Sequence, residues 1–292
     1  MHMKTNEIQI RDPFILTHDG YYYLYGSTDK DIWTTGFGFE AYRGKDLANW
    51  EPLGNVFDRP QGYWGKVNFW APEVHEYKGK FYMFASFKDN GVCRGTAVLK
   101  ADRPEGPFRP WSERALTPKD WECLDGTLHV ENGKPYLVFC HEWVQIGDGT
   151  ICAMPLTDDL SAPAGEPVLL FHASEAKSWI KALHETHGWE TAYVTDGPNM
   201  YRAQDGTLYL LWSSFCETGY AISAARSASG SIAGPWIQEE TPLFGKDGGH
   251  GMIFTAFDGQ KYLTIHTPNK TPLERAIFVP LWEKDGKLTT EE

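Results

Sequence analysis

Three aspartates and one histidine stand out as residues that could do chemistry. Asp12, Asp125 and Asp196 each precede an apolar or aromatic run, and His250 precedes a fourth. A turn glycine follows eight residues after Asp12 and Asp125, nine after His250 and ten after Asp196. An Asp before Pro or Gly often only caps a turn. However, burying a carboxylate is energetically unfavourable unless it has polar partners or a chemical role. The similar distances of these residues from their turn glycines therefore favour one shared site.

Carboxylates that converge in this way suit the acid–base hydrolysis of a glycosidic bond. One carboxyl group must be protonated so that it can donate to the leaving oxygen, and another must be ionised so that it can activate water. Neighbouring carboxylates push their pKa values apart, which allows one site to perform both roles near neutral pH.

A repeated hairpin must position these residues. Its turn glycines recur at intervals of 53 to 73 residues and are Gly20, Gly79, Gly133, Gly206 and Gly259. Asp-Gly between two strand-like runs is a strong hairpin signal, because the tight turn needs positive φ. A period near 50 with four short strands per unit is typical of a propeller blade. The sequence therefore predicts an all-β, five-bladed β-propeller in which residues 1–292 form one domain.

The longest interval, between the third and fourth hairpins, contains the one stretch that favours a helix. It runs over residues 174–183, with Ser174 as the N-cap and Lys181 towards the C-terminal end. We interpret it as an insertion in a loop and not as a second domain, because no linker or change in composition marks a boundary.

Composition narrows the class of protein. The chain has 292 residues, 12 Trp and a formal net charge of −12, which argues against nucleic acid or an anionic membrane as a partner. The five cysteines have no CxxC spacing and resemble small buried hydrophobes. No apolar stretch is long enough to span a membrane, and the N-terminus lacks a signal-peptide core. The expected location is therefore cytoplasmic, or secreted with the leader removed; no oligomeric state is indicated.

Five short motifs, spread over nearly the whole chain, resemble glycoside hydrolase family 43. They are Arg11-Asp-Pro-Phe14, Trp70-Ala-Pro-Glu-Val74, Asp125-Gly126 with Gly133-Lys-Pro-Tyr136, Thr195-Asp-Gly-Pro198, and Gly249-His-Gly251. The resemblance implies a five-bladed propeller, an inverting single-displacement mechanism, and oligo- or polysaccharides of the arabinose- or xylose-containing plant type as substrate. The implied activity is that of an α-L-arabinofuranosidase or β-xylosidase that requires no cofactor.

The resemblance also implies roles for individual carboxylates. Asp12 would be the general base, and Asp125 would orient the proton donor and raise its pKa. The family usually has Glu as the donor, whereas this chain has Asp196, which is one methylene shorter. Asp196 is the favoured donor, and Glu142 and Glu190 are the alternatives.

Substrate contacts are expected around the mouth of the channel. Glu142 is one candidate, and the aromatic side chains that could stack on a sugar are Trp33, Phe69, Trp70 and Trp143. One or two of these aromatics are expected to stack on a sugar, whereas core packing is the favoured explanation for any single one of them. Arg275 resembles a family arginine that hydrogen-bonds sugar hydroxyls, with a surface salt bridge to Glu274 as the alternative.

His250 has two interpretations. In the family, a histidine at the channel centre can contact a calcium ion or its waters. Alternatively, neighbouring backbone groups hold the ring in place. Calcium prefers oxygen ligands, and the sequence does not assemble a dense carboxylate cage, so a structural Ca²⁺ is compatible with the chain but not required.

Two other functions fit the same pattern. A propeller that binds carbohydrate without hydrolysing it is favoured by the shortened acid at Asp196. A related five-bladed fold that acts on fructosides with retention would use an Asp nucleophile, with carboxyl groups roughly 5–5.5 Å apart instead of 6.5–9.5 Å.

Overall fold

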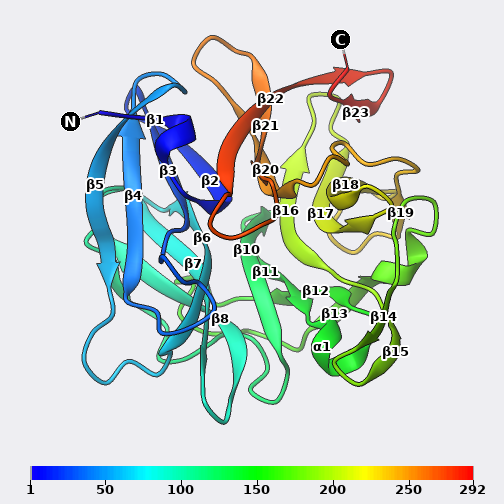
Figure 1. The fold of residues 1–292 in the computed structure, drawn as a ribbon, viewed down its shortest axis with the longest axis horizontal. Coiled ribbons are helices and arrows are strands. Elements are labelled where there is room, and N and C mark those ends of the chain that lie inside the picture. The colour runs from blue at the N-terminus through cyan, green and yellow to red at the C-terminus, as the bar shows by residue number, and fades with distance from the viewer. Residues whose placement is uncertain (1, 292) are drawn as a thin grey trace.

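Five antiparallel sheets follow one another along the chain and form the blades of the predicted β-propeller (Figure 1). The structure is a computed structural model that describes residues 2–291. The blades are numbered in chain order. Blade 1 consists of β2 (Arg11–His18), β3 (Tyr21–Ser27), β4 (Gly38–Gly44) and β5 (Asn49–Asp58), with β1 (Met3–Lys4) added outside β5. Blade 2 consists of β6 (Val67–Tyr77), β7 (Lys80–Asp89), β8 (Val92–Ala101) and β9 (Arg109–Pro110). Blade 3 consists of β10 (Cys123–Glu131), β11 (Lys134–His141), β12 (Thr150–Pro155) and β13 (Val168–His172). Blade 4 consists of β16 (Asp196–Arg202), β17 (Leu208–Cys216), β18 (Gly219–Ser227) and β19 (Trp236–Gln238). Blade 5 consists of β20 (Gly249–Thr255), β21 (Lys261–Thr267), β22 (Arg275–Lys284) and β23 (Lys287–Thr289).

The remaining elements are short and lie in loops. They are the 3₁₀ turns η1 (Thr5–Glu7) and η2 (Ala173–Glu175), the α-helix α1 (Trp143–Ile146), and a separate two-stranded hairpin of β14 (Leu183–Thr186) and β15 (Trp189–Ala192).

All five predicted turn glycines stand at the first hairpin of a blade. Their φ angles lie between 73° and 90°, a region that a residue with a side chain rarely adopts. The hairpin prediction is therefore confirmed in every blade.

Each innermost strand also carries a β-bulge close to its start. The residue at the bulge has a left-handed φ of 45–56° in every blade, and these residues are Asp12, Ala71, Asp125, Gly197 and His250. A bulge bends the strand and re-aims a side chain, and left-handed φ is strained for a residue other than glycine. Four of the five blades carry this strain at the same place, so the ring of bulges is a repeated feature of the fold.

The ring of bulges corrects one sequence interpretation. Asp12 and Asp125 are equivalent, and His250 is their counterpart in blade 5. Asp196 instead lies one residue before the bulge, paired with Ser213 across the hairpin just as Arg11 is paired with Ser27. The three aspartates are thus not all equivalent, and Asp196 enters the site from a neighbouring ring of residues.

Hydrogen bonds between consecutive blades hold the bulges together. The bulge amides of Ala71, Asp125 and His250 each donate to a serine hydroxyl of the preceding blade over 2.8 Å, the acceptors being Ser27, Ser86 and Ser213. The amide of Asp12 donates to Nδ1 of His266 over 3.1 Å, which links blade 5 back to blade 1. Burial lowers the pKa of His266 to about 4, so this imidazole is neutral and Nδ1 is free to accept.

The predicted helix over residues 174–183 is wrong. Only η2 forms at its start, and the chain then folds back so that Trp179 packs on Trp212 with ring centroids 4.9 Å apart. The amide of Lys181 donates to the carbonyl of Phe215 over 2.8 Å. These tertiary contacts outweigh the weak local helix propensity of the segment.

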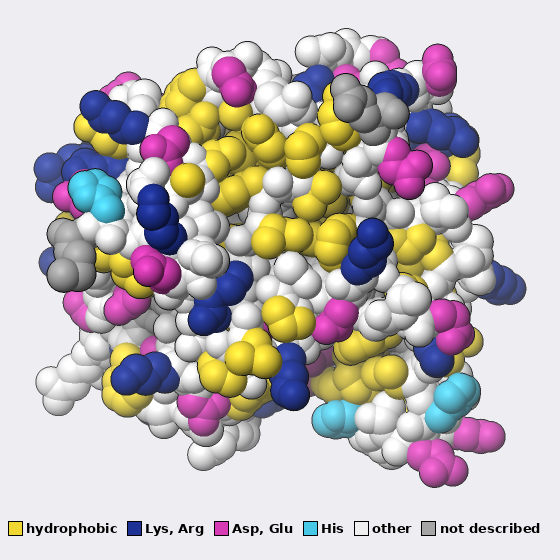
Figure 2. Space-filling model, turned by 45° about the horizontal axis from the view of Figure 1, so that its top comes forward, with side chains coloured by type: hydrophobic (Ala, Val, Ile, Leu, Met, Phe, Trp, Pro, Cys, Tyr) yellow, Lys and Arg dark blue, Asp and Glu magenta, His cyan; other side chains and the backbone are white. Residues whose placement is uncertain are grey.

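The surface and the cysteines agree with the composition. Figure 2 shows acidic and basic side chains scattered over one face, with hydrophobic side chains between them. The five cysteines are free, and Cys123, Cys140, Cys152 and Cys216 are buried. Within residues 2–291, no helix has the length and apolarity needed to cross a membrane.

Candidate active site

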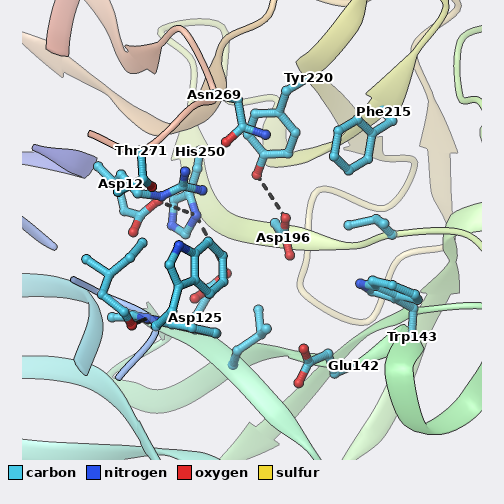
Figure 3. Close-up of a pocket in the computed structure, with 16 residues that line it drawn as sticks. Asp12, Asp125, Glu142, Trp143, Asp196, Phe215, Tyr220, His250, Asn269 and Thr271 are labelled. Atoms are coloured by element: carbon cyan, nitrogen blue, oxygen red, sulfur yellow. Dashed lines mark hydrogen bonds and ion pairs between the residues drawn. The ribbon is translucent and has the colours of Figure 1, made fainter. Parts of the chain in front are cut away.

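A cavity of about 440 Å³ opens where the innermost strands begin, and residues from all five blades line it (Figure 3). The structure brings eight of the predicted site residues together there: Asp12, Trp33, Trp70, Asp125, Glu142, Trp143, Asp196 and His250. The predicted convergence of distant carboxylates is therefore present in the fold.

Two predicted substrate contacts, Phe69 and Arg275, and the alternative donor Glu190 lie outside the cavity. Phe69 is 1% exposed and packs against Phe87, with ring centroids 4.8 Å apart. Its neighbour Trp70 reaches the cavity instead. Glu190, an alternative donor, lies exposed on β15 and does not line the cavity.

Arg275 also lies outside the cavity. Its guanidinium donates to the backbone carbonyls of Asn6, Pro272 and Glu274 and does not pair with the Glu274 side chain. The arginine in the cavity is Arg11, whose Nη1 lies 2.8 Å from Oε1 of the fully buried Glu274. The expected salt bridge to Glu274 therefore exists, but Arg11 makes it.

Asp12 lies in surroundings that favour its ionised form. Burial alone would raise the pKa of Asp12, but electrostatic interactions with His250 and Arg11 outweigh this effect and lower it. Oδ2 accepts a hydrogen bond of 2.6 Å from Ser27, and Oδ1 lies 3.2 Å from Nδ1 of His250 (Figure 3). An ionised, hydrogen-bonded carboxylate at the cavity wall can act as a base.

Asp125 is placed beside Asp12 and favours the protonated form. Burial, and then repulsion from Asp12, raise the pKa of Asp125 well above the usual carboxyl range. Its Oδ2 lies 3.6 Å from Nδ1 of His250, so that one imidazole nitrogen faces both carboxylates. The same oxygen accepts a hydrogen bond of 3.0 Å from the amide of Gly197, the residue that follows Asp196.

Asp196 has a pKa suited to proton donation. Burial, and then the nearby Asp125, raise the pKa of Asp196 to about 7. Its Oδ2 accepts a hydrogen bond of 3.0 Å from the hydroxyl of Tyr220 (Figure 3). The buried Tyr220 ring stacks on His266, with centroids 5.7 Å apart, which restricts the position of the hydroxyl.

Glu142 is held by an arginine that the sequence reasoning missed. Arg94, from β8, forms an ion pair with Glu142, and its guanidinium lies 4.1 Å from the centroid of the Trp70 ring. Burial raises the pKa of Glu142, while Arg94 opposes this shift. A carboxylate paired in this way is less free to deliver a proton than Asp196 is, but it can hold Arg94 over Trp70 and contact a substrate hydroxyl.

Aromatic side chains border the cavity. Trp33 is 57% exposed and meets the edge of Trp70, with ring centroids 5.3 Å apart. Trp143 lies at the far end of the cavity from Asp12 (Figure 3). Exposed, partly fixed indole rings provide flat apolar surfaces of the kind on which sugar rings stack.

Among the residues at the site that were not singled out from the sequence, Arg11, Tyr220 and Arg94 form polar contacts to carboxylates. Arg11 had a signal, because it stands beside Asp12 in the first motif. Tyr220 and Arg94 had none, because each acts through a partner that is distant in the chain.

The residues around His250 do not fit a calcium cage. Its Nδ1 faces Asp12 and Asp125, and Ca²⁺ takes six to eight oxygen ligands. In the part of the chain from residue 2 to 291, no group of three or more His, Cys, Asp or Glu side chains is arranged to hold a metal ion. No step of the reaction is therefore assigned to an ion.

Comparisons with known proteins place the chain in a family of glycosyl hydrolases. The model of the family "Glycosyl hydrolases family 43" matches residues 6–288. An endo-arabinase structure from Bacteroides thetaiotaomicron is similar with a TM-score of 0.90 and 41% identity, covering 98% of each chain. A thermostable family-43 glycoside hydrolase is similar with a TM-score of 0.80 and 25% identity, covering 96% of this chain and 92% of that one. An extracellular exo-α-(1→5)-L-arabinofuranosidase from Cellvibrio japonicus is 24% identical over 89% of this chain and 79% of that protein.

Proposed function

The chain belongs to family 43 of the glycosyl hydrolases, and we propose that it removes terminal α-L-arabinofuranosyl units from arabinose-containing glycans with inversion of configuration. The observation that carries the proposal is the pair of unlike carboxyl groups in one cavity. The pKa of Asp12 is lowered, which suits a base, and the pKa of Asp196 is about 7, which suits an acid. The reported relatives named as arabinofuranosidase and endo-arabinase support arabinose as the sugar, and other relatives are named xylosidase/arabinosidase.

The proposed reaction is a single displacement. Asp12 removes a proton from a water molecule, which attacks the anomeric carbon, while protonated Asp196 donates its proton to the leaving oxygen. Asp125 orients Asp196 through the Gly197 amide, and burial is the main cause that keeps the pKa of the donor high. His250 and Asp125 lie between the base and the acid (Figure 3), an arrangement that supports a separation wide enough for water.

Action on chain ends is supported by the form of the cavity. Its volume of about 440 Å³ is small for a polymer, and Trp33 and Trp143 stand on its borders. Internal cleavage is the second candidate, because the Bacteroides thetaiotaomicron relative is described as an endo-arabinase. The extracellular relative from Cellvibrio japonicus also supports action outside the cell, where such polymers occur.

Product analysis tests both parts of the proposal. With linear α-1,5-arabinan we expect arabinose as the sole early product, and β-arabinose as the first anomer detected by proton NMR. Longer oligosaccharides at early times would indicate internal cleavage, and α-arabinose as the first anomer would indicate retention. Release of xylose from xylo-oligosaccharides without release of arabinose would overturn the assigned sugar.

The pH dependence of kcat/KM should follow the two carboxyl groups. Asp196 is active when protonated, so activity should fall as the pH rises through about 7. Asp12 is active when ionised and its pKa is lowered, so the acid limb should lie below the usual carboxyl range. The profile is measured with a neutral arabinoside whose own ionisation does not interfere. A plateau that extends well above neutral pH would contradict Asp196 as the donor.

Replacing Tyr220 with Phe should move the alkaline limb upwards. The hydroxyl of Tyr220 stabilises the ionised form of Asp196, so its loss should raise the donor pKa further. A hydrogen bond to a charged group is worth about 1.5–3 kcal/mol, which corresponds to a shift of about one pH unit or more. We also expect kcat to fall several-fold because the donor is less well fixed. A lower kcat with an unmoved alkaline limb would assign Tyr220 a structural role only.

A further inference from the structure

A second cleft lies at the outer end of blade 2, away from the active site. Its volume is about 370 Å³, and it is bordered by the edge strand β9, the end of β8 and the loop between them. Arg94, near the start of β8, belongs to the active site, whereas Lys100 lies six residues further along the strand. At about 3.3 Å per residue this places the cleft roughly 20 Å from the cavity.

Three cations gather in this cleft in a protein with a formal net charge of −12. They are Lys100, Arg103 and Arg109, and none of them forms an ion pair within residues 2–291. The one acid in the cleft, Asp102, is already paired with Lys80, with 2.6 Å between Nζ and Oδ1. With three cations and one acid in its lining, the cleft carries a net positive charge.

The backbone brings two of these cations directly opposite each other. Lys100 of β8 is the register partner of Arg109 in β9. Like charges at directly opposed positions of an antiparallel pair destabilise it. An anion bound between them would relieve this repulsion. Among residues 2–291, Asp102 is the one acid that lines the cleft, and it is paired with Lys80.

An aromatic ring completes the cleft. Trp111 is 37% exposed, and its indole N–H donates to the carbonyl of Asp159 over 2.8 Å, which fixes the ring. Nζ of Lys100 lies 3.7 Å from the ring centroid, a cation–π contact that places the ammonium group at the wall of the cleft. A fixed indole beside arginines matches a ligand that has both a sugar ring and a carboxylate, because guanidinium pairs with carboxylate and an aromatic face pairs with sugar C–H groups.

We propose that this cleft binds uronic-acid units of an acidic polysaccharide and so docks the enzyme outside its active site. Arg103 and Arg109 pair with the uronate carboxylates, and the exposed part of the Trp111 ring that Lys100 leaves uncovered supports the sugar ring. Binding there leaves the active cavity open, since the two sites lie at opposite ends of blade 2. Nucleic acid combines anionic and aromatic groups too, and competition with single-stranded DNA distinguishes it from a uronate in the experiment below.

Calorimetric titration with oligogalacturonate tests the proposal without any hydrolysis. We expect saturable binding that weakens when the salt concentration is raised from about 50 to about 200 mM. The double variant Arg103→Ala/Arg109→Ala should bind at least about ten-fold more weakly. The matched control Lys134→Ala/Lys287→Ala removes the same charge from two exposed lysines outside the cleft and should bind like the wild type.

Three ligands decide what is recognised. The methyl-esterified oligomer keeps the sugar rings but lacks the charge, and it should not bind. Inorganic sulfate at matched ionic strength, and single-stranded DNA, should not compete. Equal binding of the ester, effective competition by either anion, no binding by the wild type, or equal losses in the double variant and its control would each overturn the proposal. Unchanged unfolding temperature and unchanged kcat/KM on a small arabinoside would show that the double variant is intact, whichever sugar the active site prefers.

Discussion

The variant Asp12→Asn is expected to lose nearly all hydrolytic activity while the propeller stays folded. Asn keeps the size of the side chain and can still accept the hydrogen bond from Ser27, but it cannot remove a proton from water. General base catalysis contributes about 10²–10⁴-fold, so kcat on arabinan should fall at least about 10³-fold. KM should change little, because the water and not the sugar is the partner of Asp12 in the proposed reaction.

Thermal unfolding and a matched variant complete this test. Removing the Asp12 charge loses its attraction to Arg11 and His250 but also removes its repulsion of Asp125, so the unfolding temperature should move by only a few degrees. The control Asp58→Asn alters an exposed Asp at the end of β5 of the same blade and should leave kcat unchanged. An Asp12→Asn variant with wild-type kcat would remove Asp12 from the role of base.

Local signals explain why the blades could be predicted from the sequence. Each hairpin depends on a turn glycine and the two strands beside it, and all of these are neighbours in the chain. Because the hairpin is repeated five times, the start of every innermost strand reaches the same end of the channel. This symmetry is sufficient to bring Asp12, Asp125 and His250 together.

The position of Asp196 within its strand could not be predicted in the same way. Asp12 precedes its turn glycine by eight residues and the bulge residue Gly197 precedes its own by nine, so the hairpin of blade 4 is one residue longer. Whether the extra length shifts the aspartate onto the bulge or beside it depends on its pairing with β17. Register is set by partners across the sheet, which a single sequence does not display.

The remaining corrections also follow from long-range contacts. Phe69 and Trp70 are neighbours whose side chains leave the strand on opposite sides, so only one of them can face the cavity. Arg11 pairs with the side chain of Glu274, whereas Arg275 donates to its backbone carbonyl. Which arginine reaches the carboxylate is decided by the packing of blade 5 against blade 1. The segment 174–183 loses its helix to contacts with blade 4.

The hydrogen bonds between blades connect the fold with the chemistry. Ser27, Ser86 and Ser213 each accept from the bulge amide of the next blade, whereas blade 3 has Cys140 at the corresponding position of its second strand. The Gly197 amide is therefore bound by the carboxylate of Asp125. At this one place the hydrogen bond between blades is made by Asp125, a residue of the active site, instead of a serine. The orientation of Asp196 therefore depends on Asp125.

The variant Asp196→Asn is expected to lose activity in a pattern that identifies a proton donor. Arabinan has a poor leaving group, so kcat on this polymer should fall at least about 10³-fold. p-Nitrophenyl arabinofuranoside needs little protonation of its leaving group, so its hydrolysis should fall far less. The comparison variant Glu142→Gln should lower both activities to a similar degree, because Glu142 is paired with Arg94. If Glu142→Gln showed the donor pattern and Asp196→Asn did not, the acid would be Glu142.

The same substitution of Asp196 should stabilise the protein at neutral and alkaline pH. The folded-state pKa of Asp196 is about 7, whereas the pKa of an unfolded Asp is about 3.9. Above the unfolded value the unfolded chain gains from ionisation, so the wild type loses stability until the pH passes through the folded value. A neutral Asn avoids this loss, and the free energy of unfolding at pH 8 should exceed that of the wild type by about 2–4 kcal/mol, with the gain vanishing below about pH 4. Urea unfolding at the two pH values measures the difference. Equal stability of the variant and the wild type at pH 8 would show that folding does not raise the pKa of Asp196 as proton donation requires.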